Sequence, residues 1–251
     1  MQNLIHRKEY PVHVYETGPD EKLNPVSFFN YLQDVAAEHA VMLGFGRDDM
    51  LKNNTFWVLS RISAKIREWP DMFEKVIVST WPAGTDRMFA VRNFSVSYPD
   101  GREIASAKSS WLIVDLATRR IRRPGEEFNR FKANLPSGNE PEKFAGKIEP
   151  ENNFSSKTEP FRVKMSDLDV NMHTNNTSYI KWVIDTYDEE FIKNHRPVSF
   201  LINFLSESRY GNLIEVRTAG KDGLNFYHSV VMAGTDTELC RIITGWEKST
   251  R

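Results

Sequence analysis

Two stretches of the chain share one pattern of apolar and polar positions. A shift of 151 residues places Tyr10 on Phe161, Asn24 on Asn175 and Tyr31 on Trp182. Each copy shows a short alternating stretch typical of a strand, then a polar loop, then apolar residues with helical spacing. The sequence therefore predicts an internal repeat in which strand, loop and helix occur twice.

The first predicted helix has clear start and stop signals. Asn24 suits the N-cap, Pro25 suits the first helical position, and Gly44 fits the C-terminal stop. Apolar residues with helical spacing lie between them, at Val26, Phe29, Leu32, Val35 and Ala36. The second helix is predicted to begin at residue 175 or 176 and to run to about residue 193.

After each helix the pattern changes to alternation, which predicts strands. In the first half the alternating stretches are 57–67, 74–84, 88–98 and 102–115, with a turn at Pro99-Asp100-Gly101. In the second half they are 198–208, 212–220, 224–234 and 238–248. A lone helix with several antiparallel strands buries its apolar face most simply by lying across a curled sheet, so the predicted class is α+β.

Residues 124–159 separate the two halves. They are rich in Pro, Gly, Asn, Glu and Lys and show little periodicity. This composition predicts a linker that crosses the surface. The predicted domains are therefore 1–123 and 160–251.

Composition narrows the class of protein. The 251 residues are 40% hydrophobic and 12% aromatic with a net charge of -1, which excludes a nucleic-acid-binding polycation. The first residues lack the apolar core of a signal peptide, and no apolar run approaches the roughly 18 residues of a membrane span. The single cysteine, Cys240, rules out an internal disulfide and a multi-cysteine metal site. We expect a cytoplasmic, soluble, globular protein.

The loop before the second helix holds an unusual set of polar side chains. Within "SDLDVNMHTNN", residues 166–176, are Asp167, Asp169, Asn171 and His173. The matching positions of the first copy carry ordinary turn and surface residues, Glu16, Gly18, Asp20 and Lys22. A capping role would serve both copies alike, so the difference favours a functional cluster.

Two other chemistries fit this cluster less well. The spacing of residues 167–171 imitates the start of a calcium loop, but Met172 and Ser178 stand where that loop needs Gly and Glu. Zinc would need more ligands than are visible, so no metal is expected. No Gly-x-Ser-x-Gly elbow marks a serine nucleophile, although a serine stays possible. Cys240 lies in a β-patterned segment and is interpreted as a small core residue.

Carboxylates, an amide and an imidazole acting on water suit hydrolysis of an activated acyl group. The N-terminus of the following helix can stabilise the negative charge that develops. A second candidate, Glu207, follows the next long apolar run, with Ser206 before it and Arg209 two residues on. Taken alone, Glu207 is interpreted as a surface carboxylate where a strand emerges.

The string from Asp167 to Trp182, with its Asp, Asn, His and Asn-Asn positions, resembles the signature of the acyl-acyl carrier protein thioesterases. This family comprises the plant fatty-acid chain terminators and their bacterial relatives. The strand "WVLSR", residues 57–61, is also similar, and the likeness spans nearly the whole chain. The resemblance implies a tandem double hotdog, each half a long helix wrapped by an antiparallel sheet. It also implies hydrolysis of the thioester between a fatty acyl chain and the phosphopantetheine arm of acyl carrier protein, without a cofactor.

Carried over by position, the family's catalytic Asp, Asn, His and Glu fall on Asp169, Asn171, His173 and Glu207. Plant members have a Cys directly after that Glu, where this chain has Ser208. A Cys nucleophile is therefore absent at that position, and carboxylate-activated water is expected. Glu207 is the expected base, held by Asn171 or His173, while Asp169 orients His173 or the loop; Asp169 and Glu207 could exchange these roles. The absence of a plant transit peptide indicates a bacterial-type protein.

The first half is expected to have kept the fold and lost the chemistry. Its candidates for lining the acyl pocket are Phe28, Phe29, Phe56 and Trp57, although for any one of them a place in the core is the more common role. Residues 117–132 form a basic stretch, with Arg119, Arg120, Arg122, Arg123, Arg130 and Lys132 against Glu126 and Glu127. It is either a solvated linker start or a docking patch for the acidic acyl carrier protein. Nucleic acid is the less favoured candidate partner for this stretch, because its basic residues are not interleaved with aromatic residues.

Three competing functions remain open at this point. The chain could be an acyl-coenzyme A thioesterase, a non-catalytic acyl-binding hotdog protein, or a dehydratase or hydratase on the same fold. Two fused hotdogs supply within one chain the pairing that single hotdogs find by dimerising. A monomer is therefore plausible, and a homodimer stays open.

Overall fold

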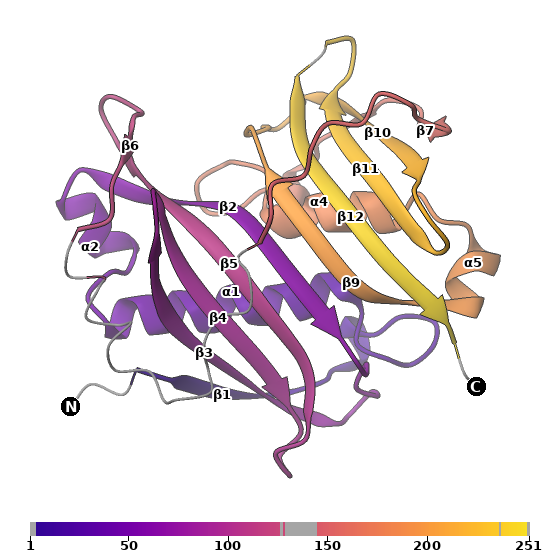
Figure 1. Ribbon diagram of the computed structural model, residues 1–251, viewed down its shortest axis with the longest axis horizontal. Helices are drawn as coiled ribbons and strands as arrows, with labels where there is room; N and C mark the ends of the chain where they lie inside the picture. The colour runs from indigo at the N-terminus through magenta and orange to yellow at the C-terminus, as the bar shows by residue number, and fades with distance from the viewer. Residues whose placement is uncertain (1–3, 126–127, 129–144, 236, 250–251) are drawn as a thin grey trace. The chain divides into compact units, whose positions relative to one another are not determined.

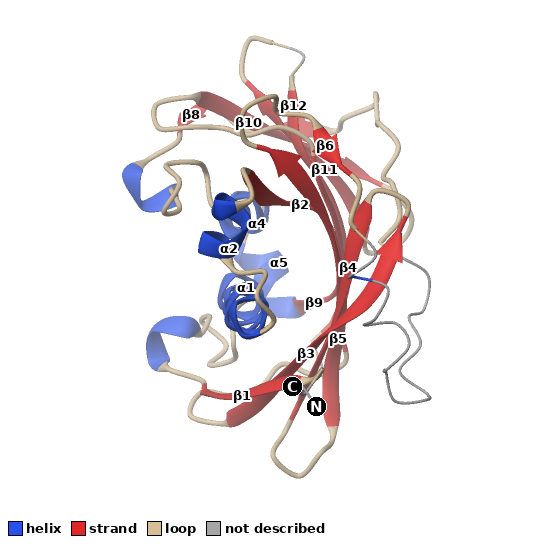
Figure 2. Cartoon of the chain, turned by 90° about the vertical axis from the view of Figure 1, so that its left-hand side faces the viewer, coloured by secondary structure: helices blue, strands red, loops and turns tan. Residues whose placement is uncertain are grey.

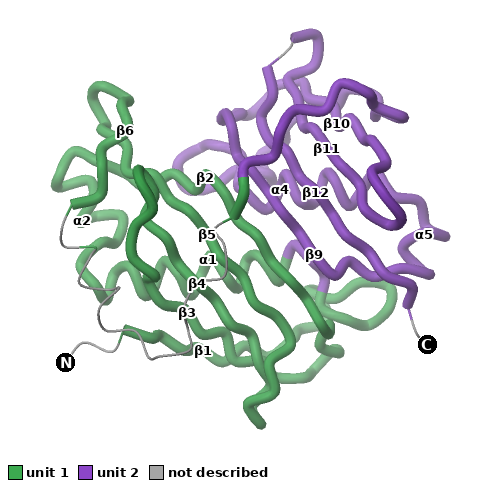
Figure 3. The backbone as a smooth tube through the Cα atoms, in the orientation of Figure 1, with its two compact units in different colours: residues 1–23, 27–146 green, residues 24–26, 147–251 purple. Residues whose placement is uncertain are grey.

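The computed structural model describes residues 4–125, 128, 145–235 and 237–249. It divides into two compact units, residues 1–23 with 27–146 and residues 24–26 with 147–251 (Figure 3). We call them unit 1 and unit 2. In each unit one main helix lies against one face of that unit's antiparallel sheet (Figures 1 and 2).

Unit 1 contains one long helix and an antiparallel sheet. Its helices are α1 (Pro25–Met42), α2 (Arg47–Lys52) and the short 3-10 turn η1 (Val14–Glu16). Its strands are β1 (His6–Pro11), β2 (Thr55–Ile66), β3 (Lys75–Asp86), β4 (Phe89–Ser97), β5 (Glu103–Asp115) and β6 (Ile121–Arg122). The strand order is β1-β3-β4-β5-β2, all neighbours are antiparallel, and β6 pairs with β5.

The predicted punctuation of α1 is confirmed. The helix starts at Pro25, and Gly44 beyond its end has a φ of 78°, the left-handed conformation that a glycine accepts at low cost. Its apolar face packs on the sheet, where Tyr31 stacks on Tyr10 of β1 with ring centroids 4.3 Å apart. His39 reaches β4, because its Nδ1 lies 3.1 Å from Arg92 Nη1.

Unit 2 repeats the arrangement with a shorter main helix. Its helical segments are η3 (Met165–Asp167), α4 (Asn176–Ile184) and α5 (Glu189–Asn194). Its strands are β7 (Ser156–Lys157), β8 (Phe161–Arg162), β9 (His195–Phe204), β10 (Leu213–Gly220), β11 (Asn225–Met232) and β12 (Glu238–Lys248). The order is β9-β12-β11-β10, with β7 and β8 both pairing with β10. Among the described residues, no helix is long and apolar enough to cross a membrane.

The prediction of one continuous second helix to residue 193 is wrong. The chain leaves the helix after Ile184 and starts α5 at Glu189. Asp188 acts as the N-cap of a new helix, because its carboxylate accepts a 2.7 Å hydrogen bond from the N–H of Phe191 at the start of α5. Tyr187 lies between the two helices and places its hydroxyl 2.6 Å from Thr244 Oγ1 on β12.

The interval predicted as a linker includes packed residues at its C-terminal end. Ile148 is 3% exposed, its N–H donates to Asn203 Oδ1 at 2.8 Å, and its carbonyl accepts from Arg241 Nη1 at 2.8 Å. β7 then extends the sheet beside β10. Residues 126–127 and 129–144 lie outside the described residues. The predicted boundaries at 123 and 160 stay a prediction.

Candidate active site

The loops that precede α1 and α4 follow one backbone path. In each, a 3-10 turn is followed by an isolated bridge, Thr17 to Leu23 in unit 1 and Leu168 to Thr174 in unit 2. Glu21 and Met172, which the 151-residue shift superimposes, both have a φ of 61°. The predicted repeat therefore extends to the loops, and one backbone conformation carries two different sets of side chains.

A second segment lies beside each loop and is also repeated. The Thr174 N–H donates to Ser208 O at 2.9 Å, and the Leu23 N–H donates to Pro70 O at 2.9 Å. Ser208 therefore corresponds to Pro70, and the shift between matching residues is 138 here rather than 151. This register comes from the hydrogen bonds of the folded chain.

His173 and Glu207 meet where these two segments adjoin. His173 Nε2 lies 3.4 Å from Glu207 Oε2 and 3.4 Å from Arg209 Nη2. The side chains of His173 and Glu207 are 23% and 46% exposed, so both can reach solvent. A ring protonated on Nε2 donates toward Glu207, whereas the other tautomer accepts from Arg209. The sequence alone assigns no role to Arg209, because its partner His173 comes from the other segment.

Unit 1 places different chemistry at the same positions. Lys22 corresponds to His173, Asp71 to Arg209 and Trp69 to Glu207. Lys22 and Asp71 form an ion pair, and Trp69 is only 5% exposed. Unit 1 thus has a salt bridge and a buried indole where unit 2 has an imidazole beside a carboxylate.

Asp169 shapes the loop that carries His173. Its Oδ1 accepts from the N–H of Asn171 at 2.8 Å and from the N–H of His173 at 3.2 Å. In unit 1 the equivalent N–H, that of Lys22, is bound by Asp20 Oδ1 at 3.1 Å. Asn171 is exposed and joins the loop through this backbone bond. The geometry therefore favours Asp169 as the organiser of the loop and Glu207 as the group free to contact water.

The N-terminus of α4 begins just after His173. Asn175 caps the helix, because its Oδ1 accepts from the N–H of Thr177 at 3.1 Å. This confirms the predicted start of the second helix. The positive end of the helix dipole is thus close in the chain to the imidazole.

The four aromatic residues predicted to line an acyl pocket all lie in unit 1. Phe28 and Phe29 are 3% and 4% exposed and belong to the core. Trp57 is half-buried, and its Nε1–H donates to Phe45 O at 2.9 Å. Phe56 is half-buried beneath the guanidinium of Arg119, 5.2 Å from its ring centroid. Their role toward a substrate stays a prediction.

The basic stretch is partly engaged in local contacts. Arg122 forms an ion pair with Asp115. Backbone and side-chain hydrogen bonds from Thr118, followed by the one from Arg122, lower the pKa of Asp115 to about 2. Arg120 and Arg123 are exposed, while Arg130 and Lys132 lie outside the described residues.

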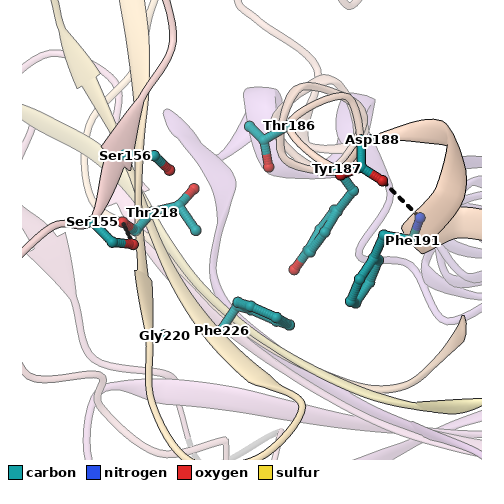
Figure 4. A pocket seen from close by; sticks show the side chains of 9 residues that line it. All are labelled: Ser155, Ser156, Thr186, Tyr187, Asp188, Phe191, Thr218, Gly220 and Phe226. Carbon is teal, nitrogen blue, oxygen red and sulfur yellow. Dashed lines mark hydrogen bonds between the residues drawn. The ribbon is translucent and has the colours of Figure 1, made fainter.

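A pocket of about 280 Å³ lies beyond the other end of α4 (Figure 4). It is lined by Ser155, Ser156, Thr186, Tyr187, Asp188, Phe191, Thr218, Gly220 and Phe226. Behind it His228 is fully buried, 2.9 Å from Tyr187 Oη and 3.0 Å from Thr218 Oγ1. Burial lowers the pKa of His228 to about 3, so this ring is neutral at ordinary pH. None of the predicted catalytic residues lines this pocket.

His228 is expected to make the protein less stable as the pH falls from 7 to 5. Burial lowers its pKa to about 3 from the usual 6.5, so in this window the unfolded chain gains a proton that the folded chain does not. The resulting loss in the free energy of unfolding is about 2 kcal/mol. Urea unfolding at both pH values measures it. His228→Gln should remove most of this difference and His13→Asn, at an exposed position, should keep it; equal pH dependence in wild type and His228→Gln would contradict the assignment.

Comparison with known proteins places the chain among thioesterases. It is 24% identical to the oleoyl-acyl carrier protein thioesterase of Coriandrum sativum, over 98% of this chain and 77% of that protein. It is 25% identical to the palmitoyl-acyl carrier protein thioesterase of Cuphea hookeriana, over 90% of this chain and 58% of that protein.

Solved structures agree in fold. An acyl-ACP thioesterase from Bacteroides thetaiotaomicron is 26% identical with a TM-score of 0.84, covering 97% of this chain and 98% of that one. The 12:0-ACP thioesterase from Umbellularia californica has a TM-score of 0.86 at 23% identity, covering 99% of both chains. The predicted α+β double hotdog is confirmed. The models of the acyl-ACP thioesterase N-terminal and C-terminal domains match residues 3–130 and 150–248, and the chain therefore belongs to the acyl-ACP thioesterase family.

Proposed function

We propose that this protein hydrolyses the thioester of fatty acyl-acyl carrier protein and releases the free fatty acid. The observation that carries the proposal is the approach of His173 Nε2 to Glu207 Oε2, 3.4 Å, at the N-terminal end of α4. Relatives named as acyl carrier protein thioesterases support the choice of carrier. The proposed chemistry uses water, the side chains of this loop and segment, and the N-terminus of α4.

In the proposed mechanism Glu207 is the general base. Its carboxylate takes a proton from water as the water oxygen attacks the thioester carbonyl carbon. The carbonyl oxygen becomes an oxyanion, which the positive end of the α4 helix dipole stabilises. The tetrahedral intermediate then breaks its C–S bond, and the protonated Glu207 returns its proton to the departing thiolate. His173 holds the Glu207 carboxylate in place, and Asp169 fixes the loop that carries His173.

Thiol release from acyl-acyl carrier proteins tests this proposal. We expect release from a series with acyl chains of eight to eighteen carbons, and slower release when the same acyl groups are attached to coenzyme A. Faster release from coenzyme A would make the protein an acyl-coenzyme A thioesterase. Binding of the acyl carriers without any release would make it an acyl-binding protein and would overturn the proposal.

The carrier is proposed to dock through the basic stretch of unit 1. Arg120 and Arg123 are exposed, whereas Arg122 is engaged with Asp115. Replacing Arg120 and Arg123 together by Ser is expected to raise KM for the acyl carrier protein substrate about tenfold and to leave kcat unchanged, because steering of a charged partner acts on encounter. Added salt should raise the wild-type KM in the same way.

The matched control for this prediction replaces Arg7 and Lys52, which are exposed in unit 1 outside the basic stretch. The double Ser variant at these positions makes the same change in net charge and should keep the wild-type KM. Equal KM values for the Arg120/Arg123 variant and wild type at low salt would rule out docking at this stretch.

Trp57 is proposed as the best candidate among the four aromatic residues for limiting acyl chain length. Unlike Phe28 and Phe29 it is only half-buried, and it packs against Leu43, Met50, Ala90, Ile113 and Phe128. Trp57→Leu removes ring volume and is expected to shift the ratio of kcat/KM values toward longer acyl chains. The acyl-chain series measures this ratio, and thermal melting is recorded in parallel. A destabilised variant with an unchanged ratio would assign Trp57 to the core alone.

A further inference from the structure

Three hydroxyl groups form a buried cluster directly behind His173 and Glu207. Ser208 Oγ lies 2.7 Å from Thr174 Oγ1 and 2.9 Å from Tyr179 Oη. Ser208 is fully buried, and Thr174 and Tyr179 are 7% and 2% exposed. Thr174 comes from the loop before α4, Tyr179 from α4 itself, and Ser208 from the segment after β9. The cluster therefore joins three separate parts of unit 2.

Burying three hydroxyl groups destabilises the folded protein unless they form hydrogen bonds with one another. A buried hydroxyl that lacks a partner loses the free energy of its hydration. Burial raises the pKa of Tyr179 to about 12, so its hydroxyl remains protonated and can donate. Ser208 can donate one hydrogen bond and accept two, which makes it the natural centre of the cluster.

Unit 1 shows that the fold itself does not require these hydroxyls. The matching residues there are Leu23, Pro70 and Phe28, and all three are buried. The backbone bond from Leu23 N–H to Pro70 O is nevertheless the same as the bond from Thr174 N–H to Ser208 O, 2.9 Å in both. One packing arrangement is thus apolar in the unit that lacks the His–Glu pair and hydroxylated in the unit that has it.

Two members of the cluster are chain neighbours of catalytic candidates. Thr174 directly follows His173, and Ser208 directly follows Glu207. We propose that Thr174, Ser208 and Tyr179 form a positioning device that fixes the His173 loop against the Glu207 segment. Ser208 is then a positioning residue and not a nucleophile, because its hydroxyl is fully buried. The catalytic consequence of this inference rests on the proposed function.

The need for such a device follows from exposure. The Glu207 side chain is 46% exposed and its separation from His173 Nε2 is already 3.4 Å, so the position of Glu207 depends on the backbone segment that carries it. A displacement of about 1 Å in a catalytic constellation costs on the order of 100-fold in rate. Apolar packing holds two segments together, whereas directed hydrogen bonds also fix their register.

The test removes the hydroxyls and keeps the shape. The triple variant Thr174→Val, Ser208→Ala and Tyr179→Phe removes the three hydroxyls together, so none of them is left without its hydroxyl partner. We expect the melting temperature to stay within a few degrees of wild type and kcat to fall about 30-fold, with KM for acyl-acyl carrier protein unchanged. Ser229→Ala, which removes another buried hydroxyl of unit 2, should keep the wild-type kcat.

A double-mutant cycle separates positioning from a general loss of activity. If the cluster acts through Glu207, adding the triple variant to Glu207→Gln should cause no further fall in kcat. Independent, additive losses would overturn the inference, as would a wild-type kcat in the triple variant.

A spectroscopic measurement keeps the inference testable if wild type shows no hydrolysis. The ring ¹H–¹³C NMR signal of His173, assigned with His173→Gln, should be single and sharp in wild type and should shift in Glu207→Gln. In the triple variant it should broaden or move toward its Glu207→Gln position. An unchanged signal would overturn the inference, whereas absent hydrolysis with the expected signal would overturn only the proposed function.

Discussion

Glu207→Gln is expected to lower kcat for acyl-acyl carrier protein hydrolysis about a thousandfold, within the range that a positioned general base contributes. The amide keeps the size of the side chain and can still face His173, so the geometry at 3.4 Å is largely preserved. It cannot take a proton from water. KM should change little, since the loss falls on a transition-state interaction and not on substrate binding.

Single-turnover thiol release measures this loss without interference from product release. Glu247→Gln, at an exposed carboxylate on β12, is the matched control and should keep the wild-type rate. A Glu207→Gln protein that folds and turns over like wild type would transfer the role of base to another group. Asp169 is the first alternative, because the sequence allows the two carboxylates to exchange roles.

Two substitutions of Asp169 are expected to differ from each other. Its Oδ1 accepts from the N–H groups of Asn171 and His173, and the side-chain oxygen of Asn can accept both bonds. Asp169→Asn should therefore keep kcat within about tenfold of wild type. Asp169→Ala removes both bonds, releases the loop that carries His173, and should lower kcat about 100-fold.

The comparison of the two Asp169 variants decides between two roles for the carboxylate. If its charge were essential, Asn and Ala would lower kcat equally. Asp20→Ala is a control for loop stability, since Asp20 Oδ1 binds the equivalent N–H in unit 1, whose loop carries no His–Glu pair. It should leave kcat unchanged even if it lowers the melting temperature.

Local sequence signals were sufficient wherever a short-range pattern decides the structure. Asn24-Pro25 and Gly44 placed the ends of α1, and alternation placed the strands within a few residues of their observed bounds. The repeat of strand, loop and helix was also visible, because a 151-residue shift preserves the apolar positions from the strand into the first turns of each helix. The Asp-Asn-His loop was found by its difference from the sister loop.

Features that depend on a choice between two local structures, or on contacts with residues far away in the chain, could not be predicted from the sequence. The break between α4 and α5 arises because Asp188 caps a new helix and Tyr187 leaves to meet Thr244. An apolar periodicity that continues across the break hides both events. The sequence likewise predicts Ile148 as part of a polar linker. Its packing follows only from the hydrogen bonds of its backbone with Asn203 and Arg241.

The sequence by itself determined the α+β class, the repeat, the start of both helices and the candidates Asp169, Asn171 and His173, and its resemblance to a known family added Glu207. Only the tertiary structure decided how the segment after β9 matches its copy. α1 runs over 18 residues and α4 over nine, and this difference supplies most of the change in the shift from 151 to 138 between the loop and that segment. The hydrogen bonds from the N–H groups of Leu23 and Thr174 show which residues of the two units match. Glu207 then corresponds to Trp69, and the hydroxyl-bearing residues Thr174, Ser208 and Tyr179 correspond to the apolar residues Leu23, Pro70 and Phe28. A linear pattern loses this information because helix length changes the spacing of residues along the chain, whereas packing keeps their positions in space.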